Sequence, residues 1–306
     1  MSILRCPACH GSLTEIAGGM RCERCHRVYP VEQNIADFSG GRYYDSFDPA
    51  VPLPPEAMRG LQLEVSGTRR RIIDYYEPHL RARGAARVLD CGTGNGVAVD
   101  LLNERGFEAW GVDLSTLRKY QWRERARRDR LVVADVASLP FPDGYFDVLI
   151  ASGLLEHVGV NESRTSRYEI REQPQKQQER RRVVQEFLRV TSPHGTVFLD
   201  FPNGAFPIDF WHGDRPGEAR WHRTSEAFLP RVDEIKSIVR SIDPALRVRA
   251  ISPYRRLQFV QAAEHWYGRL LARPANAFFF VMRAPGLRWL AGSRLNPFLV
   301  TEVSRS

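Results

Sequence analysis

The chain has 306 residues and a mass of 35.0 kDa, enough for about two domains of ~100–200 residues each. Its 43% hydrophobic and 26% charged residues are typical of a globular protein, which excludes a disordered, fibrous or integral membrane class. We expect a cytoplasmic protein without a transmembrane segment, because no secretory signal and no apolar run of ~18 residues is found. The net charge of +8 favours anionic partners, whether nucleic acid, anionic lipid or phosphorylated sugars.

Cysteines mark the first forty residues. Two Cys-x-x-Cys pairs stand twelve residues apart: Cys6, Cys9, Cys22 and Cys25. Two such turns can aim four thiolates at one ion and make a closed, structural zinc site. Disulfides are the alternative, but a cytoplasmic chain would keep them reduced, and redox Cys-x-x-Cys motifs occur singly. His10 and His26 follow the two pairs; they could replace a ligand, but we expect them to lie beside the site.

About 35 residues are too few to bury a sufficient core, so the metal would have to supply folding free energy. The stretch 27–38 is strand-like and contains Tyr-Pro-Val-x-x-x-Ile. With the Cys-Pro-x-Cys and Cys-x-x-Cys pairs, residues 3–38 resemble the Trm112-like zinc ribbons, which occur as partners of methyltransferases or as modules fused to them. We therefore predict a zinc ribbon over residues 1–40.

A linker or lid is predicted next, over residues 41–57, because two glycines and four prolines around it interrupt regular structure. Tyr43 and Tyr44 in this stretch could stack on a ligand or pack in the ordinary way. Apolar residues then recur at helical spacing from Met58 to Leu80. The main domain is predicted to cover residues 58–306.

Strands and helices alternate through that domain. Strands are expected at 87–90, 107–112, 131–134, 146–151 and 195–201, and helices at 97–105, 115–128 and 179–190. Repeated βα units predict an α/β fold with a parallel sheet covered by helices on both faces. Ligands of such sheets bind beyond the carboxyl ends of the strands.

The first strand ends in an acid and a glycine loop. Asp90, Gly92, Gly94 and Gly96 follow one another at every second position, and Val97 stands where a dinucleotide-binding loop needs its third glycine. A carboxylate there would repel a pyrophosphate held at the helix N-terminus. S-adenosylmethionine has no phosphate and carries two cationic groups, so an acid suits it, while glycines let the backbone approach it closely.

Two further acids end the next two strands. Asp113 stands 23 residues after Asp90, where a carboxylate can accept hydrogen bonds from ribose hydroxyls. Asp135 stands 22 residues later, where it can accept from an adenine amino group. Either acid alone could be a helix cap or a turn former, but three acids at three successive strand ends indicate a nucleoside site.

Residues 85–203 resemble the class I S-adenosylmethionine-dependent methyltransferases through VLDCGTGNG, GVDLS, ADVASLPFPDGYFDVLIASGLLEHV and PHGTVFLDFPN. The resemblance implies a Rossmann-like, seven-stranded sheet whose last two strands, fitted by 247–251 and 297–303, are antiparallel partners. It also implies cofactor contacts from these residues: Asp90, Gly92, Gly94, Asp113, Leu114, Asp135, Val136, Ala151 and Ser152. Cys91 departs from the common pattern and is expected to be packed and inert.

The acceptor side is expected after the fourth and fifth strands. His157, next to Glu156, is our candidate base for a hydroxyl or amine; a packing or capping role is the alternative. After the fifth strand, aromatic residues alternate with polar groups that suit a polar head on an apolar body, or that form a packed surface loop. These polar groups are Asp209, His212, His222 and Arg223.

Two insertions interrupt the domain. Residues 161–182 are highly charged and predict a solvated helical extension or, alternatively, an arm for partner docking or substrate gating. Residues 254–296 mix aromatic residues with arginines, a composition that suits contact with an anionic bilayer, a homodimer interface or a cover over the pocket.

The sequence thus predicts a methyltransferase that uses S-adenosyl-L-methionine and structural Zn²⁺, and that acts on a small-molecule or lipid- or sugar-linked acceptor. O-methylation is slightly favoured, and the location is cytoplasmic, with peripheral membrane contact open. One alternative is an RNA methyltransferase that uses the ribbon and the arginines, although the Asn/Asp-Pro-Pro-Tyr/Phe signature of base N-methylation is missing. The other is a non-catalytic adaptor that binds the cofactor.

Overall fold

The computed structural model describes residues 3–164, 168–214, 218–222, 228–257 and 265–305. Seven strands form the sheet of the main domain, in the order β7-β6-β5-β8-β11-β15-β14. Their bounds are β5 Arg87–Cys91, β6 Glu108–Asp113, β7 Leu131–Val133, β8 Phe146–Ser152, β11 Thr191–Pro202, β14 Leu246–Ile251 and β15 Phe298–Arg305. Strands β7 to β11 pair in parallel, while β15 runs antiparallel to β11 and β14. The predicted seven-stranded, mostly parallel sheet is confirmed.

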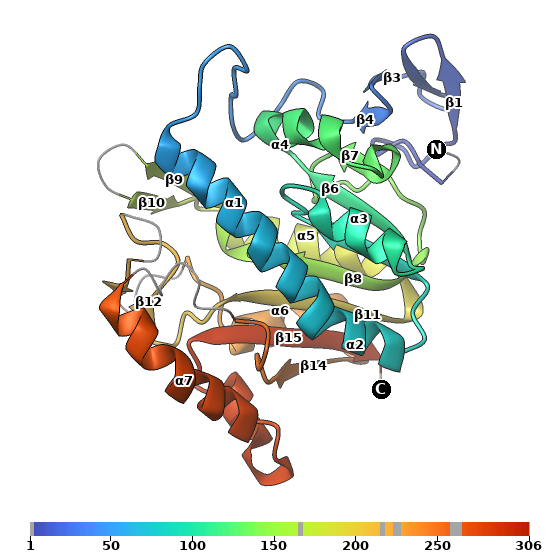
Figure 1. The fold of residues 1–306 in the computed structure, drawn as a ribbon. Helices are drawn as coiled ribbons and strands as arrows, with labels where there is room; N and C mark the ends of the chain where they lie inside the picture. Colours follow the sequence, from blue (N-terminus) through green and yellow to red (C-terminus); the bar gives the residue numbers. More distant parts are fainter. Residues whose placement is uncertain (1–2, 165–167, 215–217, 223–227, 258–264, 306) are drawn as a thin grey trace.

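Four short strands from the N-terminal segment extend this sheet: β1 Leu13–Ile16, β2 Gly19–Cys22, β3 Val28–Glu32 and β4 Ile35–Asp37. They pair as antiparallel neighbours, and β4 then pairs in parallel with β7 through Ala36↔Val132 and Asp37↔Val133. The result is one eleven-stranded sheet with the ribbon at its edge (Figure 1).

Helices cover both faces, as the βα alternation predicts. One face packs against α1 Pro55–Arg70, the π-helical turn η1 Arg71–Tyr76, α2 Glu77–Ala82 and α3 Val97–Glu104. The first three run on without a break, and α1 crosses in front of the sheet in Figure 1. The other face packs against α5 Lys176–Val190 and α6 Val232–Ile242.

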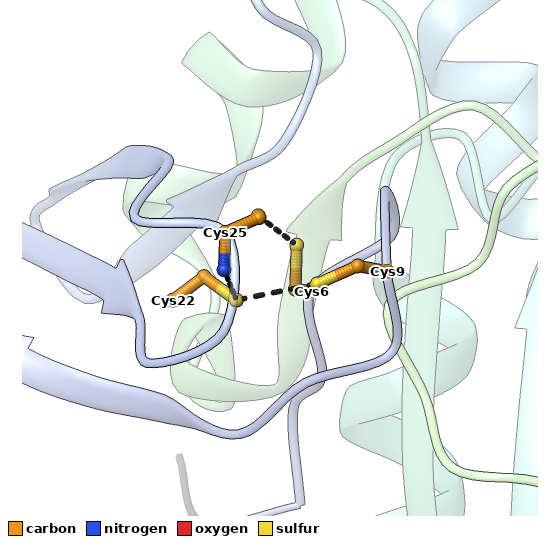
Figure 2. A group of neighbouring side chains, drawn as sticks. All are labelled: Cys6, Cys9, Cys22 and Cys25. Atoms are coloured by element: carbon orange, nitrogen blue, oxygen red, sulfur yellow. Dashed lines mark hydrogen bonds between the residues drawn. The ribbon is translucent and has the colours of Figure 1, made fainter.

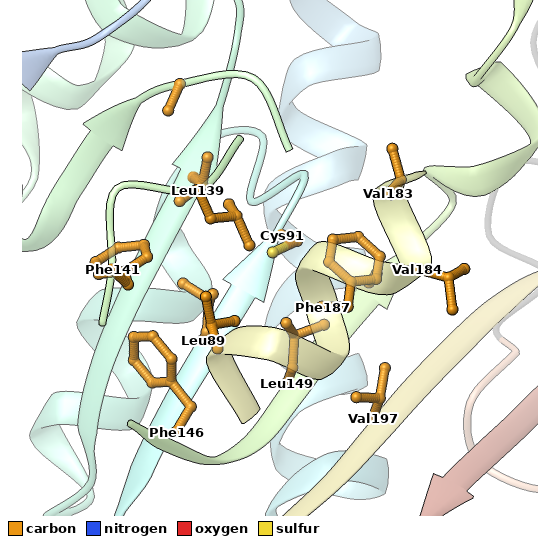
Figure 3. Close-up of a cluster of buried hydrophobic side chains, with 14 of the residues drawn as sticks. Leu89, Cys91, Leu139, Phe141, Phe146, Leu149, Val183, Val184, Phe187 and Val197 are labelled. Carbon is orange, nitrogen blue, oxygen red and sulfur yellow. The ribbon is translucent and has the colours of Figure 1, made fainter. Parts of the chain in front are cut away.

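Alternate residues of the strands divide between two cores, because successive strand side chains point to opposite faces. Val88 and Val148 belong to the core under α1–α3. Leu89 and Leu149 belong to the core under α5, where Figure 3 shows them packed around Phe187. Cys91 is fully buried in this second core, and burial raises its pKa well above the usual value, so the expected packed position is confirmed.

Some elements differ from the expectation. The helix after Ser115 is short (α4 Thr116–Gln121) and continues as 3₁₀ turns, η2 Trp122–Glu124 and η3 Arg128–Arg130. Between η2 and η3, Asp100 accepts hydrogen bonds from the backbone N–H groups of Ala126 and Arg127. Helix α6 was not predicted, although Ile235, Ile238, Val239 and Ile242 repeat at helical spacing and three of them are buried.

The predicted helical extension in 161–182 is wrong over its first half. Here the chain forms a hairpin of β9 Val160–Arg164 and β10 Tyr168–Glu172, and only then enters α5. Apolar Tyr168 and Ile170 alternate with charged residues, a period of two that suits a strand. A smaller hairpin, β12 Ile208–Asp209 with β13 Arg220–Trp221, follows β11.

The second insertion carries α7 Trp266–Val281 and the 3₁₀ segment η6 Pro285–Gly292, between β14 and β15. Figure 1 shows α7 at the side of the sheet that is opposite the ribbon. None of the helices in the described residues combines the length and the apolar character that a bilayer crossing requires.

Candidate cofactor and acceptor sites

The four predicted zinc ligands converge within the ribbon, as Figure 2 shows. The Sγ atoms of Cys6 and Cys25 are 3.5 Å apart, those of Cys9 and Cys22 are 3.4 Å apart, and all four lie within 4.8 Å of one another. Tetrahedral zinc with Zn–S bonds of ~2.3 Å would place its sulfurs about 3.8 Å apart. The four thiols therefore fit a tetrahedral zinc ion.

The two histidines close the turns that carry the cysteines. His10 and His26 have φ values of 58° and 60°, and their backbone N–H groups donate to the carbonyls of Cys6 and Cys22. Both side chains are exposed. Their place beside the cysteine cluster, rather than in it, agrees with the expectation.

At the carboxyl edge of the sheet, the carboxylate of Asp90 is fully buried. Neither of its oxygens has a hydrogen-bond partner among the described residues, and Thr93 lies near without the geometry of a bond. Burial raises the pKa of Asp90, although Arg71 Nη2 at 3.7 Å from Oδ2 opposes the shift. The buried Nε of Arg71 also lacks a partner among these residues. The ion pair of Asp90 and Arg71 thus leaves three buried polar atoms without hydrogen bonds in the described part of the chain, which is uncommon in folded proteins.

The π-helical turn η1 explains why Arg71 is there. A π turn adds a residue to the helix and re-aims the side chains around it, and such turns are frequent at functional sites. In this chain η1 directs Arg71 toward Asp90 and Tyr76 toward Asp200. Sequence reasoning read residues 58–80 as one ordinary helix and missed both side chains.

The glycine loop adopts a left-handed backbone. Gly92 and Gly94 have φ values of 69° and 58°, a region that other residues rarely adopt. A Cβ on Gly94 would lie 2.6 Å from Oε1 of Glu64, which reaches over the loop from α1 and pairs with Arg118 at 2.9 Å. Because Gly94 has no side chain, Glu64 can approach its backbone closely, and the ion pair of Glu64 and Arg118 lies beside the loop.

Asp113 ends β6 beside this loop and is almost fully buried. Burial raises its pKa, while backbone N–H groups oppose the shift: Gly94 donates to Oδ2 at 2.9 Å and Leu114 to Oδ1 at 2.8 Å. Tyr44 of the predicted linker also donates to Oδ1, at 3.2 Å. The other face of the tyrosine stays open, since 68% of the residue is exposed.

The linker is anchored across this edge by one acid. Both oxygens of Asp45 accept hydrogen bonds from the start of α4, including Ser115 Oγ at 2.6 Å and Thr116 N at 2.6 Å. An acid at a helix N-terminus is favoured by the helix dipole. Tyr44 is consequently held over Asp113, as a lid strand would hold it.

The other predicted contacts lie along the same edge. Asp135 is exposed and its Oδ1 accepts from Ala137 N at 2.8 Å, the turn-forming role named as the alternative. Val136 is half-buried, and Ala151 is buried in the core under α5. Ser152 Oγ donates to Asp200 Oδ1 at 2.7 Å. The structure places all of them at the carboxyl ends of β7 and β8.

A buried ion pair lies under the site. Asp200, fully buried on β11, accepts from Tyr76 and Ser152, and from Arg256 Nε at 2.9 Å and Nη2 at 2.7 Å. Burial acts to raise the pKa of Asp200, but the charge of Arg256 outweighs it and lowers the pKa. Breaking such a pair would cost about 3–5 kcal/mol. The sequence offered no signal for this pairing, because Arg256 comes from the second insertion.

On the acceptor side, η4 Leu155–His157 follows β8 and presents Glu156 and His157. Glu156 is buried and its Oε2 has no partner among the described residues; burial raises its pKa. His157 Nδ1 contacts Oε1 of Glu162, from the inserted hairpin. Burial acts to raise the pKa of Glu162, but the hydrogen bonds from His157 and Tyr168 lower it to about 2.

His212 joins this pair from the loop after β11. Its ring lies 5.4 Å from that of His157 and stacks on Tyr168 at 5.5 Å. Its Nδ1 is 2.9 Å from Oδ2 of Asp209, a fully buried acid. His222, ten residues further along the chain, is also buried. Arg223 falls outside the described residues. Of the predicted polar groups, His212 thus lies beside His157 and Asp209 contacts His212, while the hairpin that contributes Glu162 was not predicted.

Comparisons with known proteins agree with this architecture. Residues 89–199 match the family described as "Methyltransferase domain", and residues 1–34 match the family "Trm112p-like protein". The first match covers β5 to β11, with the glycine loop and the acids at the strand ends, and the second covers the four cysteines.

Curated relatives match over shorter stretches. A malonyl-[acyl-carrier protein] O-methyltransferase of Enterobacter lignolyticus is 33% identical over 26% of this chain and 32% of its own length. An uncharacterized methyltransferase of Mycobacterium sp. is 30% identical over 39% of each chain. The matches therefore span about a third of the length of these relatives.

Solved structures resemble the chain over most of its length. A TehB-like S-adenosylmethionine-dependent methyltransferase from Corynebacterium glutamicum is 15% identical over 82% of this chain and 96% of its own, with a TM-score of 0.46. A chain from a complex of the Haloferax volcanii Trm112 methyltransferase activator is 16% identical over 81% and 95%, also with a TM-score of 0.46. Residues 89–199 therefore carry a methyltransferase domain, and a Trm112-like segment precedes it in residues 1–34.

Proposed function

We propose that the protein transfers a methyl group from S-adenosylmethionine to an oxygen acceptor presented at the carboxyl edge of the sheet. The observation that carries the proposal is the ion pair of Asp90 and Arg71, in which both carboxylate oxygens and Nε of Arg71 are buried without a hydrogen bond among the described residues. The amino acid part of the cofactor bears an ammonium and a carboxylate, one complement for each group. No phosphate-binding arrangement is needed at this edge.

The remaining contacts follow from the geometry of the loop. Gly92 and Gly94 let the backbone approach the ligand, and Asp113 is placed to accept from the ribose hydroxyls. Asp135, Val136, Leu114, Ala151 and Ser152 are proposed around the base and the methionyl chain. Tyr44 holds Oδ1 of Asp113 in the structure, so the ribose would take over the acceptor that this tyrosine uses.

This competition makes two substitutions act in opposite directions. Asp113→Asn should weaken binding of S-adenosylhomocysteine about 10–100-fold, because hydrogen bonds to a charged acceptor contribute ~1.5–3 kcal/mol each. Tyr44→Phe should leave binding unchanged or strengthen it a few-fold, since it removes the competing hydroxyl. Isothermal calorimetry measures both. Equal affinity of wild type and Asp113→Asn would remove Asp113 from the cofactor site, and no binding by wild type would end the methyltransferase proposal.

We retain His157 as the catalytic residue on the acceptor side. Methyl transfer is an in-line displacement, so the protein mainly aligns the acceptor with the methyl group and assists loss of its proton. His157 follows β8, the strand next to β5, and Glu162 orients its ring. Its side chain is 38% exposed, which leaves it accessible to an acceptor.

A membrane-linked acceptor is the substrate class that the second insertion favours. Large apolar side chains of α7 and η6 are exposed: Trp266 70%, Leu270 64%, Phe280 54% and Trp289 65%. No acidic residue occurs between His265 and Glu302, while five arginines do: Arg269, Arg273, Arg283, Arg288 and Arg294. Exposed tryptophans and arginines without acids suit an anionic bilayer, where each basic residue contributes ~1 kcal/mol.

Vesicle sedimentation tests this surface. The protein should bind vesicles that contain phosphatidylglycerol and should dissociate from them at high salt. It should not bind vesicles of phosphatidylcholine alone. The double variant Trp266→Ser/Trp289→Ser should lose at least about tenfold in affinity. Ile16→Ser is the control, because Ile16 is exposed on β1 of the ribbon, far from α7 (Figure 1). Salt-sensitive binding of RNA without vesicle binding would instead support the RNA methyltransferase alternative.

A further inference from the structure

The cluster of Glu156, His157 and His212 has more organisation than a proton-transfer site requires. One side-chain ligand atom from each residue lies within 4.8 Å of the others. Glu156 and His212 are buried, with residue exposures of 2% and 3%, and His157 is exposed. The three therefore form a cluster of donor atoms with two buried members and one exposed member.

Each histidine is oriented by a carboxylate behind it. Glu162 contacts Nδ1 of His157, and Asp209 Oδ2 lies 2.9 Å from Nδ1 of His212. Asp209 is itself fixed by the backbone N–H groups of Trp211 at 2.9 Å and of His212 at 3.2 Å. Metal-binding histidines almost always make this contact with one ring nitrogen, while the other ligates the ion.

The third ligand supplies an independent observation. Oε2 of Glu156 has no hydrogen-bond partner among the described residues, although the side chain is buried. An unpaired carboxylate in such a place is costly, and a cation between it and the two rings would satisfy it. Two imidazoles and one carboxylate form a ligand set used by divalent transition metals, with coordination positions left for substrate.

We propose that Glu156, His157 and His212 bind a divalent transition-metal ion, with Glu162 and Asp209 as positioning residues. The role of the ion rests on the proposed function. The ion would bind the acceptor oxygen and favour the deprotonated form of the acceptor. His157 would then act on the acceptor through the ion that it ligates. The acceptor O–H proton then leaves to solvent, the oxygen attacks the methyl carbon, and the C–S bond breaks with its electron pair going to sulfur.

Mn²⁺ is a suitable probe, because imidazole and carboxylate ligands accept it, whereas the four-cysteine site prefers zinc. In zinc-loaded full-length protein, loss of the free Mn²⁺ signal in electron paramagnetic resonance should report one bound ion per chain. Glu156→Gln and His212→Ala should each weaken Mn²⁺ binding more than about tenfold, and Asp209→Asn about tenfold. His194→Ala, at an exposed histidine near the start of β11, should change nothing.

Calorimetry with S-adenosylhomocysteine accompanies each variant, so failure of the cofactor site and failure of the metal site are told apart. Retained nucleoside binding with lost Mn²⁺ binding supports the proposal. No Mn²⁺ binding by wild type, or equal binding by wild type and the nearly isosteric Glu156→Gln, would overturn it. Should His212→Ala not fold, Glu156→Gln alone decides.

Discussion

Replacing Asp90 by asparagine should stabilise the ligand-free protein and at the same time weaken its cofactor binding. The carboxylate is fully buried, accepts no hydrogen bond from the described residues, and lies 3.7 Å from the guanidinium of Arg71. An amide of the same shape avoids the cost of burying a charge, so the free energy of unfolding should rise by about 1–3 kcal/mol at neutral pH. Affinity for S-adenosylhomocysteine should fall at least about tenfold, because the ammonium loses its charged partner.

The pH dependence of this gain follows from the direction of the pKa shift. Burial raises the pKa of Asp90 in the folded state above its usual value of 3.8. As pH rises through that value, the unfolded chain ionises while the folded protein resists, so wild type loses stability relative to Asp90→Asn. The difference in unfolding free energy should therefore be absent at low pH, grow above about pH 4, and level off once the folded state has also ionised.

Urea denaturation of the apo protein at several pH values measures this difference. Asp129→Asn is the control, because Asp129 is exposed and should stay within about 0.5 kcal/mol of wild type. A destabilised Asp90→Asn variant would mean that attraction to Arg71 outweighs the burial cost. In that case Asp90 and Arg71 would be a structural ion pair, and the main support for the cofactor site would be lost.

The parts of the molecule that could be predicted are those in which local sequence determines the outcome. The strands of the sheet, the glycine loop and the acids after β5 and β6 follow from short apolar runs and the residues that end them. The cysteine cluster follows from spacing alone. Each of these features depends on residues that lie within a few tens of positions of one another in the sequence. A sequence pattern can reveal relations over that separation.

Long-range partners could not be predicted. Arg256 reaches Asp200 and Ser152 from an insertion, and Arg71 reaches Asp90 through a π turn that no propensity foretells. His212 joins His157 because the loop after β11 folds back, and the hairpin of β9 and β10 brings Glu162 to the same place. Side chains from four separate segments meet at the carboxyl edge, so their chemistry becomes visible only once the chain has folded.

The pairing of β4 with β7 is another long-range feature, and through it a metal bound by the four cysteines would affect the stability of the whole molecule. Met20, Cys22 and Tyr29 of the ribbon belong to one buried core with Trp110 and other residues of the main domain. Further contacts cross the junction: Arg5 N donates to the carbonyl of Pro140 at 3.0 Å, Ser138 Oγ donates to that of Pro7 at 2.8 Å, and Lys119 pairs with Asp37 at 2.7 Å. The strands of the ribbon and the strands β7 and β6 beside the proposed cofactor site therefore belong to one sheet and are joined by one core.

Cys22→Ser should for this reason lower the melting temperature of the entire protein, by on the order of 10 °C, because loss of a structural metal removes several kcal/mol. Zinc release, followed with a chromogenic chelator, should coincide with the loss of far-ultraviolet ellipticity in a single transition. Glu15→Gln, at an exposed position of β1, is the control and should leave both unchanged. Release of zinc well below an unshifted main transition would contradict the shared core. The expected outcome, a single shifted transition, would mean that the metal stabilises β7 through the ribbon. Strand β7 pairs with β6, which ends in Asp113. Zinc occupancy would then also affect the affinity for the cofactor.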